Sequence, residues 1–490
     1  MPANLNPITV VSSLLPDVLG HNRRCTRDDV AQTLLPVLRS HGGAWVGSLA
    51  RPDRESIRES LAHFGHRNGF EMHPVALDDA DLEGGYHGFA HSVIWPLFHG
   101  MDEHCDRQPG FWKAYLELNR KFALHIARAP GMSRRVWIHD CGLIHTGSML
   151  RAAVPDAKQL GFFLHLPFPP LDTLRRLATA SQLVNALLDY DVVGFQTRRD
   201  LQNFRHAVRF FAPRGELTAT EPRTSISVGH RTVRATVLPV GTDFEDISAR
   251  SGGRSVLERM RTLKEDIGPY KMLIGVDRLD YTSGVLQRLD AFEMALERYP
   301  RLREQVILYQ QVVPGRQDTG ALAGLKSRLE EAVGRICGRF STRSWSPVRY
   351  RYGTVGSVEL SAMYRLAAAA LVTPLRDGMN LTAKDFVASR VDHGGALILS
   401  EFAGAAGQLC EGALLVNPYD TDQTAQAIVE ALSLSSADKA RRMRAMRAST
   451  RETHASWWAR QFIDLMDERP ARALETTAAP SPYADSIELG

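Results

Sequence analysis

The sequence contains few cysteines, no long apolar run and no marked excess of either charge. Its five cysteines lie far apart along 490 residues and show no metal-ligand spacing, which is typical of reduced thiols in the cytosol. No apolar stretch approaches the ~20 residues that span a membrane. The N-terminus also lacks the basic region and apolar core of a signal peptide. We therefore expect a cytoplasmic protein with no membrane span, no secretory signal and no bound metal.

The balanced charge and the absence of several short motifs argue against further functional classes of protein. Lysine and arginine total 59 against 55 aspartates and glutamates, so the net charge of +4 predicts neither a nucleic-acid partner nor a membrane surface. No nucleophile elbow, zinc-binding motif, Walker A loop or GxGxxG segment occurs. Hydrolase, metalloenzyme and dinucleotide-binding interpretations therefore lack support.

What the sequence does contain is a regular alternation of short apolar strands and longer amphipathic helices. This alternation predicts an α/β fold with parallel sheets covered by helices on both faces. The helical patterns include residues 285–298, 322–334 and 421–434. The strand candidates are residues 8–15, 134–142, 160–168 and 190–197 in the first half, and 271–279, 305–314, 369–377, 396–404 and 413–420 in the second.

The length predicts more than one domain, because single cores rarely grow beyond ~250–300 residues. We assign residues 1–240 and 241–452 to two doubly wound domains facing a cleft, joined near residues 237–246. A helix at 453–467 carries one apolar stripe, with Trp458, Phe462 and Leu465 at helical spacing. The remaining residues, 468–490, are rich in Ala, Pro and Thr, and we expect a disordered tail.

Polar residues recur where the strand candidates end. His139-Asp140, His165, Arg278 and Asp377 each follow or end an apolar run, two in each half. Ligands bind at the carboxyl ends of strands in open α/β sheets, so these residues predict a site closed between two domains. After Asp377 a helix is expected to begin near Leu381, and its first N–H groups and positive dipole end suit a phosphate.

The blocks VWIHD, GFFLHLPFP, GVDRLDY, VTPLRDGMNL, LSEFAGAA and LLVNPYD together resemble the trehalose-6-phosphate synthases in order, spacing and detail. Weaker similarity joins these blocks from about residue 8 to residue 467. The resemblance implies the GT-B fold, with two Rossmann-like domains and a deep cleft. It also implies transfer of glucose from a nucleotide-glucose donor, UDP- or GDP-glucose, with retention of configuration. No metal or other cofactor is expected.

The resemblance further implies a role for each matching residue. Four side chains are expected to be catalytic. Asp377 would bind hydroxyls of the donor sugar, Arg278 would stabilise the diphosphate, His165 would lie against the donor hexose, and Asp140 would hold an acceptor hydroxyl. The other expected donor contacts are Ser283, Gly378, Met379, Asn380, Leu381 and Asp385, and the other expected acceptor contacts are Tyr86, Trp95 and Arg316. The family's last helix crosses back to the first domain, so residues 453–467 are expected to do so too.

The sequence departs from the family pattern mainly where phosphates are bound. Leu14 stands where the family has an arginine for the acceptor phosphate, and Ser283 stands where it has a phosphate-binding lysine. Ser48 replaces a tryptophan, and Asp385 replaces the glutamate that binds the ribose. The mobile Gly-Gly-Leu loop of the family has its nearest match at residues 27–30, where Arg23, Arg24 or Arg27 is a candidate source of replacement charge.

These departures lead us to expect a hexosyltransferase with a specialised acceptor, such as a nucleoside, an aminosugar or a cyclitol, in natural product biosynthesis. The main alternative is an ordinary trehalose-6-phosphate synthase that uses glucose 6-phosphate. A pseudo-glycosyltransferase that forms a C–N bond and a non-catalytic regulatory homologue are further alternatives. The sequence leaves the donor base and any homo-oligomer open.

Overall fold

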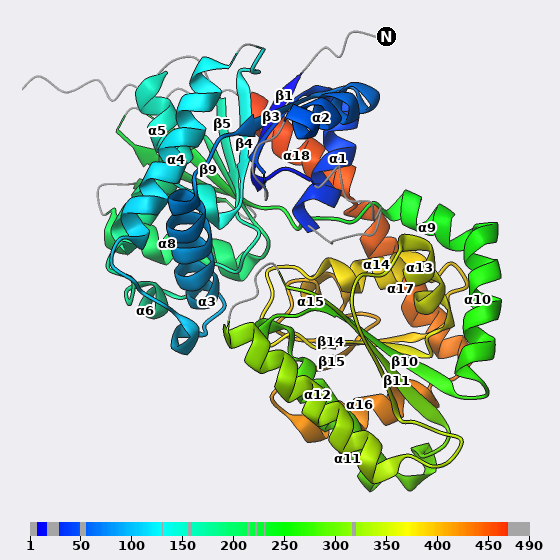
Figure 1. Ribbon diagram of the computed structural model, residues 1–490. Helices are drawn as coiled ribbons and strands as arrows, with labels where there is room; N and C mark the ends of the chain where they lie inside the picture. Colours follow the sequence, from blue (N-terminus) through cyan, green and yellow to red (C-terminus); the bar gives the residue numbers. More distant parts are fainter. Residues whose placement is uncertain are drawn as a thin grey trace, which may run out of the picture.

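The structure, a computed structural model, describes residues 7–16, 29–49, 55–129, 131–154, 159–212, 216–220, 223–229, 231–315 and 320–468. These residues form two α/β domains, each built around one sheet with helices packed on its faces (Figure 1). The expected α/β class and two-domain organisation therefore match the architecture that the structure describes.

The first domain contains a sheet in the order β3-β2-β1-β4-β5-β6-β9-β8-β7 within the described residues. Its strands are β1 (Ile8–Leu14), β2 (Gly43–Ser48), β3 (Glu71–Val75), β4 (Arg135–His139), β5 (Gln159–Phe163), β6 (Val192–Phe195), β7 (Glu216–Thr220), β8 (Arg223–Val228) and β9 (Arg231–Val237). The helical elements are α1 (Asp29–His41), α2 (Glu55–Asn68), η1 (Asp81–Ile94), α3 (Trp95–Phe98), η2 (Asp102–His104), α4 (Phe111–Arg128), η3 (Cys141–Leu143), α5 (Thr146–Ala153), α6 (Leu171–Leu174), α7 (Ala180–Leu187) and α8 (Arg198–Phe211).

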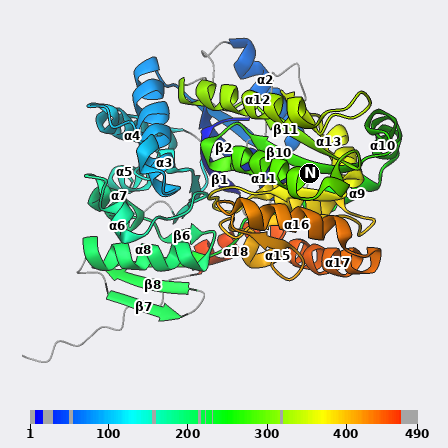
Figure 2. The same ribbon diagram turned by 90° about the horizontal axis from the view of Figure 1, so that it is seen from below.

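One edge of this sheet corrects the prediction of parallel pairing. The strands from β3 to β9 pair in parallel, whereas β8 pairs antiparallel with both β9 and β7. Figure 2 shows the β7–β8 pair at the outer edge of the first domain. Antiparallel neighbours need only a short connection, and short segments separate these strands, so no crossover helix is present to mark them in the sequence.

The second domain contains a parallel sheet in the order β12-β11-β10-β13-β14-β15 within the described residues. Its strands are β10 (Lys271–Arg278), β11 (Val306–Val313), β12 (Val348–Tyr352), β13 (Ala369–Val372), β14 (Ala396–Ser400) and β15 (Leu414–Val416). Its helical elements are α9 (Phe244–Gly252), α10 (Arg254–Ile267), η4 (Tyr281–Ser283), α11 (Val285–Arg298), η5 (Pro300–Leu302), α12 (Gly320–Phe340), α13 (Ser357–Leu366), α14 (Leu381–Ser389), α15 (Ala406–Leu409), α16 (Thr421–Ser433) and α17 (Ser436–Glu452).

Both sheets are doubly wound. Successive strands are added first on one side of the first strand and then on its other side. The reversal lies between β1 and β4 in the first domain and between β10 and β13 in the second. Ligands bind at such switch points, at the carboxyl ends of the strands. Asp140 follows β4, Arg278 ends β10, and Asp377 follows β13, so the polar residues noted in the sequence lie at these points.

The last helix, α18 (Ala455–Asp467), packs on the sheet of the first domain (Figure 1). The ring of Phe462 stacks on Trp137 of β4, with 4.4 Å between centroids and 12° between planes. Arg135 of β4 forms an ion pair with Asp467 at 2.6 Å. The apolar stripe that the sequence placed on this helix is therefore buried, and it is buried against the other domain.

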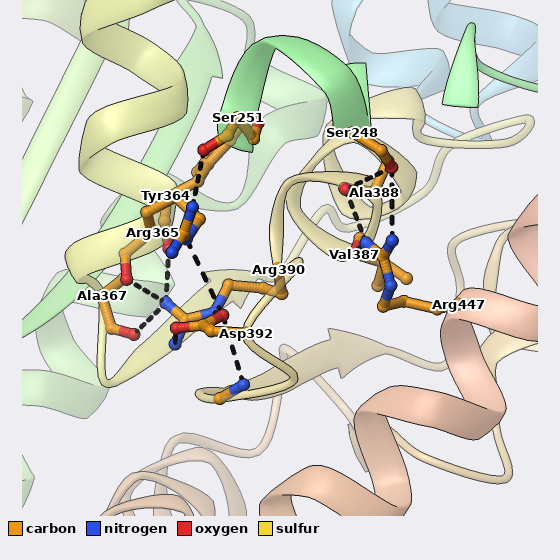
Figure 3. Close-up of polar contacts among 11 residues, drawn as sticks. Ser248, Ser251, Tyr364, Arg365, Ala367, Val387, Ala388, Arg390, Asp392 and Arg447 are labelled. Atoms are coloured by element: carbon orange, nitrogen blue, oxygen red, sulfur yellow. Dashed lines mark hydrogen bonds and ion pairs between the residues drawn. The ribbon is translucent and has the colours of Figure 1, made fainter. Parts of the chain in front are cut away.

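Arginine side chains hold the helix that carries the predicted donor loop. Arg447 of α17 donates to the carbonyl oxygens of Val387 (3.0 Å) and Ala388 (2.6 Å), near the C-terminal end of α14 (Figure 3). Arg390, just beyond α14, is buried and donates to the carbonyl oxygen of Tyr364 near the end of α13. These contacts satisfy carbonyl groups that helix ends leave unpaired, and they fix the direction in which α14 points.

Candidate active site

The two domains touch at the carboxyl ends of their central strands. A methyl group added at Gly378, after β13, would overlap the carbonyl oxygen of His165, after β5. The guanidinium of Arg278 lies over the ring of Trp95, 5.4 Å from its centroid. Backbone and side-chain contacts therefore bring together the polar residues that the sequence placed in separate halves.

Asp377 forms the centre of a tight turn between β13 and α14. Its carboxylate accepts hydrogen bonds from the N–H of Met379 (3.1 Å) and from the side-chain amide of Asn380 (3.0 Å). Asn380 has a left-handed backbone, with φ of 78°, and its side chain caps α14 by accepting from the N–H of Ala383. The helix begins at Leu381, as the sequence predicted, and its capping residue is Asn380.

The main chain of this turn is packed against a second loop. The N–H of Asp377 donates to the carbonyl oxygen of Phe402 at 3.2 Å, and the N–H of Gly404 donates to the carbonyl oxygen of Asp377 at 3.1 Å. A methyl group at Gly404 would overlap the carbonyl oxygen of Gly378. Only glycine permits this approach, and the turn is therefore held on one side by residues 402–404 and on the other by His165.

Arg278 lies next to Asp277, whose carboxylate is bound within a buried polar network and so does not face the site. Asp277 is paired with the buried Arg288 (3.0 Å) and accepts from the side chain of Gln310 (2.8 Å). Arg288 also donates to the hydroxyl of Thr373 at 3.0 Å, which joins β10 to the segment after β13. Because Arg288 balances the charge of Asp277, the half-buried Arg278 remains available to an anion.

Ser283 and Asp385 make contacts within the protein. The Ser283 hydroxyl donates to the carbonyl oxygen of Asp280 at 2.6 Å. The carboxylate of Asp385 accepts from the hydroxyl of Thr242, and the neighbouring Lys384 amine donates to the carbonyl oxygen of Val240 at 2.6 Å. Asp385 and Lys384 of α14 thus bind the segment that joins the domains. Burial lowers the pKa of Lys384 to about 7.

On the side of the first domain, four rings form a row that leads to Arg278. Tyr86 and His91 of η1 lie 4.5 Å apart, His91 and Trp95 lie 5.9 Å apart, and Trp95 and His99 lie 4.6 Å apart between centroids. Burial is the main cause that lowers the pKa of His99 to about 4, so this ring is neutral at pH 7. An aromatic wall suits the apolar face of a sugar ring.

Asp140 has a backbone conformation that non-glycine residues rarely adopt. Its φ is 86°, and its carboxylate accepts from the N–H of Gly142 at 3.3 Å. Such conformations cost of order 1–3 kcal/mol and are found where surrounding structure holds a functional group in place. The next strand end carries His165, whose Nε2 lies 3.1 Å from Nδ1 of His139.

A model of glycosyltransferase family 20 matches residues 20–468. The chain belongs to glycosyltransferase family 20. A bifunctional trehalose-6-phosphate synthase/phosphatase of Thermoproteus tenax is 41% identical over 435 residues, which are 87% of this chain and 58% of that protein. The trehalose-6-phosphate synthase of Mycolicibacterium smegmatis is 34% identical, with 98% of this chain and 95% of that protein covered.

The fold of this family 20 enzyme agrees with solved structures. An α,α-trehalose-phosphate synthase (UDP-forming) from Burkholderia xenovorans, solved with glucose-6-phosphate, has a TM-score of 0.85 and 31% identity, covering 94% of this chain and all of that one. The GT-B fold and the resemblance to trehalose-6-phosphate synthases are therefore confirmed. The protein is a nucleotide-sugar-dependent glycosyltransferase.

Two of the departures from the expected pattern, Leu14 and Ser48, lie at the ends of β1 and β2. Leu14 and Ser48 are partners in the parallel register of these strands. Ser48 is buried, and its hydroxyl donates to the carbonyl oxygen of Ser13 at 2.6 Å. Its side chain therefore belongs to the sheet. Arg316, Arg23, Arg24 and Arg27 lie outside the described residues, as does the predicted tail beyond Glu468.

Sequence reasoning missed several residues that shape this site. His91 and His99 had no role assigned. His91 follows Tyr86 by five residues, Trp95 follows His91 by four, and His99 follows Trp95 by four. Because η1 is a π-helix, its i and i+5 side chains meet, and the α-helical period does not pair Tyr86 with His91. Thr242 carried no signal, since a threonine in a linker is unremarkable until its partner is known.

Two kinds of feature are absent from the part of the chain that the structure describes. Within it, no group of three or more His, Cys, Asp or Glu side chains is arranged to hold a metal ion. No helix in the same residues has the length and apolar character needed to cross a membrane. Cys105, Cys141, Cys337 and Cys410 form no disulfide.

Proposed function

We propose that this enzyme transfers glucose from UDP-glucose to glucose 6-phosphate, with retention of configuration, to form trehalose 6-phosphate. This was the alternative interpretation of the sequence, and the comparisons support it better than the specialised acceptor. The solved relative from Burkholderia xenovorans is described as UDP-forming and holds glucose-6-phosphate. The contact of Gly378 with His165 carries the proposal, because it joins the predicted donor loop in the second domain to a predicted catalytic residue of the first domain.

In the proposed reaction the bond between the glucose C1 and the diphosphate oxygen breaks as the acceptor oxygen attacks C1 from the same face. The proton of the acceptor hydroxyl passes to the departing phosphate oxygen, so no side chain needs to act as the base. Arg278 and the first N–H groups of α14 would stabilise the negative charge that develops on the diphosphate. Asp377 and His165 would hold the donor hexose, and Asp140 and the ring row would hold the acceptor.

We also propose that the reaction needs no metal ion, because the assigned counter-charges are Arg278 and the start of α14. The measurement is the rate of transfer after exhaustive treatment with EDTA. An unchanged rate is expected. Activity that is lost with EDTA and restored by magnesium or manganese would contradict the proposal. A cytoplasmic location and the absence of nucleic-acid and membrane partners, as predicted from the sequence, remain part of it.

A second candidate function is transfer to a larger and less anionic hydroxyl acceptor. Leu14 favours it, because an aliphatic side chain cannot pair with a phosphate at the end of β1. Loss of one charge-assisted contact to a phosphate would weaken binding by about 1.5–3 kcal/mol.

One competition assay tests both functions. Labelled UDP-glucose and GDP-glucose are offered separately, with glucose 6-phosphate, glucose, a nucleoside, an aminosugar and a cyclitol as acceptors. Saturable formation of trehalose 6-phosphate at micromolar glucose 6-phosphate supports the first function and excludes the second. Preferred transfer to an uncharged acceptor supports the second. A C–N linked product would point to a pseudo-glycosyltransferase, and consumption of neither donor would contradict both functions.

A further inference from the structure

A pair of histidines lies under the contact between the two domains. His139 ends β4 and is fully buried, and its Nδ1 lies 3.1 Å from Nε2 of His165, within hydrogen-bond distance. The two rings are 5.3 Å apart between centroids. His165 also supplies the carbonyl oxygen against which Gly378 packs. The conformation of His165 is therefore set from below by His139 and from above by the donor loop.

Aromatic side chains enclose the ring of His139. The centroids of Trp137, Trp458 and Phe163 lie 4.5, 6.0 and 6.4 Å from its own. Among the described residues no group forms a hydrogen bond with its Nε2. Burial lowers the pKa of His139 well below the ordinary value for histidine, with the nearby His165 as the second cause. His165 is the other titratable group that faces it, so His139 is a neutral imidazole.

The two ways of placing the shared proton are not equivalent. If His165 donates from Nε2, then His139 must carry its own proton on Nε2, where an N–H would be buried among aromatic rings without an acceptor. If His139 donates from Nδ1, its Nε2 holds only a lone pair. Buried N–H groups without a partner are rarer than buried acceptors without one, and leaving one unpaired costs about 1–3 kcal/mol. The hydrogen-bond network thus favours donation by His139.

We infer that His139 is a positioning residue that keeps Nε2 of His165 unprotonated, so that neutral His165 carries its proton on Nδ1 as a hydrogen-bond donor for the donor hexose. Both tautomers of an isolated imidazole are accessible, and the hydrogen bond from Nδ1 of His139 is compatible with only one of them in His165. The inference rests on the proposed function for one point, namely that His165 contacts the donor sugar.

The crossing helix α18 contributes to this arrangement. Trp458 packs edge-on against Phe163, with 4.9 Å between centroids, and lies 6.2 Å from the ring of His165. It therefore covers the pair from the side and excludes the water that would offer His139 another acceptor. The C-terminal segment of the second domain thereby completes the surroundings of a side chain in the first.

The direct test is the protonation of His165 in the wild-type enzyme with ¹⁵N-labelled histidine. Imidazole nitrogen resonances can be assigned by their loss in His165→Gln and His139→Asn variants. We expect the resonance of a protonated nitrogen at Nδ1 of His165 and that of an unprotonated, hydrogen-bonded nitrogen at Nε2. The reverse pattern, or averaged resonances for both nitrogens, would overturn the inference. This readout does not depend on turnover, so it stands apart from any failure of the proposed function.

A pair of variants separates the hydrogen bond from simple packing. His139→Phe keeps an aromatic ring but removes the donor, whereas His139→Asn places an amide N–H near the position of Nδ1. We expect kcat to fall about tenfold in His139→Phe, on the scale of one lost hydrogen bond, with KM for the acceptor unchanged and most of kcat recovered in His139→Asn. Equal losses in both variants, or no loss in His139→Phe, would contradict the inference. Thermal unfolding shows whether each variant folds.

Discussion

The donor side and the acceptor side of this site are built in different ways. The donor side is centred on one continuous segment, residues 373–385, whose turn is held by the side chains of Asp377 and Asn380 and by backbone bonds to residues 402–404. The acceptor side combines the ring row of η1 and α3, the strained Asp140 and the ends of β1 and β2, which are far apart in the sequence. We expect substitutions in the local donor turn to be poorly tolerated. The acceptor side is formed by separate segments, so one of its residues can change without disturbing the others.

The largest effect is expected at the centre of the donor turn. Asp377→Ala removes the carboxylate proposed to bind the sugar, together with two hydrogen bonds within the turn. We expect kcat/KM to fall about a thousandfold, while the fold survives because the residue is in a half-buried loop. Steady-state kinetics with UDP-glucose measure it. Asp438→Ala, near the start of α17, is the matched control, and near-normal turnover of Asp377→Ala would refute the donor assignment.

A steric change tests whether the two sides must touch. The variant is Gly378→Ala. Its added methyl group would meet the backbone of His165, which cannot move aside as a side chain can. Displacement of the loop by about 1 Å would cost on the order of a hundredfold in kcat. The control is Gly407→Ala in α15, where an added methyl group has no neighbour within 4 Å. Equal activity of the two variants would show that catalysis does not need this contact.

Arg278 joins the two sides, since it ends β10 and lies over Trp95. Arg278→Ala should raise the barrier by more than ~2 kcal/mol, about thirtyfold in rate, because a preorganised positive charge is lost. Arg278→Lys keeps the charge but not the planar group, and should recover part of the rate. A loss of tenfold or less in Arg278→Ala would move the diphosphate contact to another residue.

The acceptor side should respond to a charge added at the end of β1. Leu14→Arg places a cation at the position where the family resemblance implies an arginine for the acceptor phosphate. We expect KM for glucose 6-phosphate to fall about tenfold or more, and KM for glucose to stay the same. Leu14→Met, which adds length without charge, is the control. An unchanged KM for glucose 6-phosphate in Leu14→Arg would show that its phosphate does not lie near β1.

The smallest effect concerns the helix behind the donor turn. Burial lowers the pKa of Lys384 from 10.5 to about 7, so its charge destabilises the folded state fully below pH 7 and progressively less as the pH rises towards 10.5. The wild type should therefore gain stability from pH 7 to pH 9 relative to Lys384→Met, by at most about 1.4 kcal/mol per pH unit. Melting temperatures at several pH values measure this difference. Parallel curves would contradict it, and exposed Lys264→Met is the control.

The sequence predicted those parts of the molecule that depend on neighbours along the chain. Each of the predicted strand segments overlaps a strand, and the helix expected at residues 285–298 has those bounds as α11. The turn at Asp377 was predictable because a buried strand, a glycine and a helix start follow one another directly. The expected α12 was too short, since 322–334 lies within Gly320–Phe340.

Only the tertiary structure decided how distant segments meet. The pairing of His139 with His165, the bond from Thr242 to Asp385 and the ring row from Tyr86 to Arg278 join residues on separate elements. The strands β7 and β8 were missed because their short polar sequences lack an apolar run, and β2, β3, β9 and β12 were missed as well. Apolar periodicity records which face of an element is buried, but it does not record which side chain lies opposite. That choice follows from how the two sheets and α18 pack, which no local pattern contains.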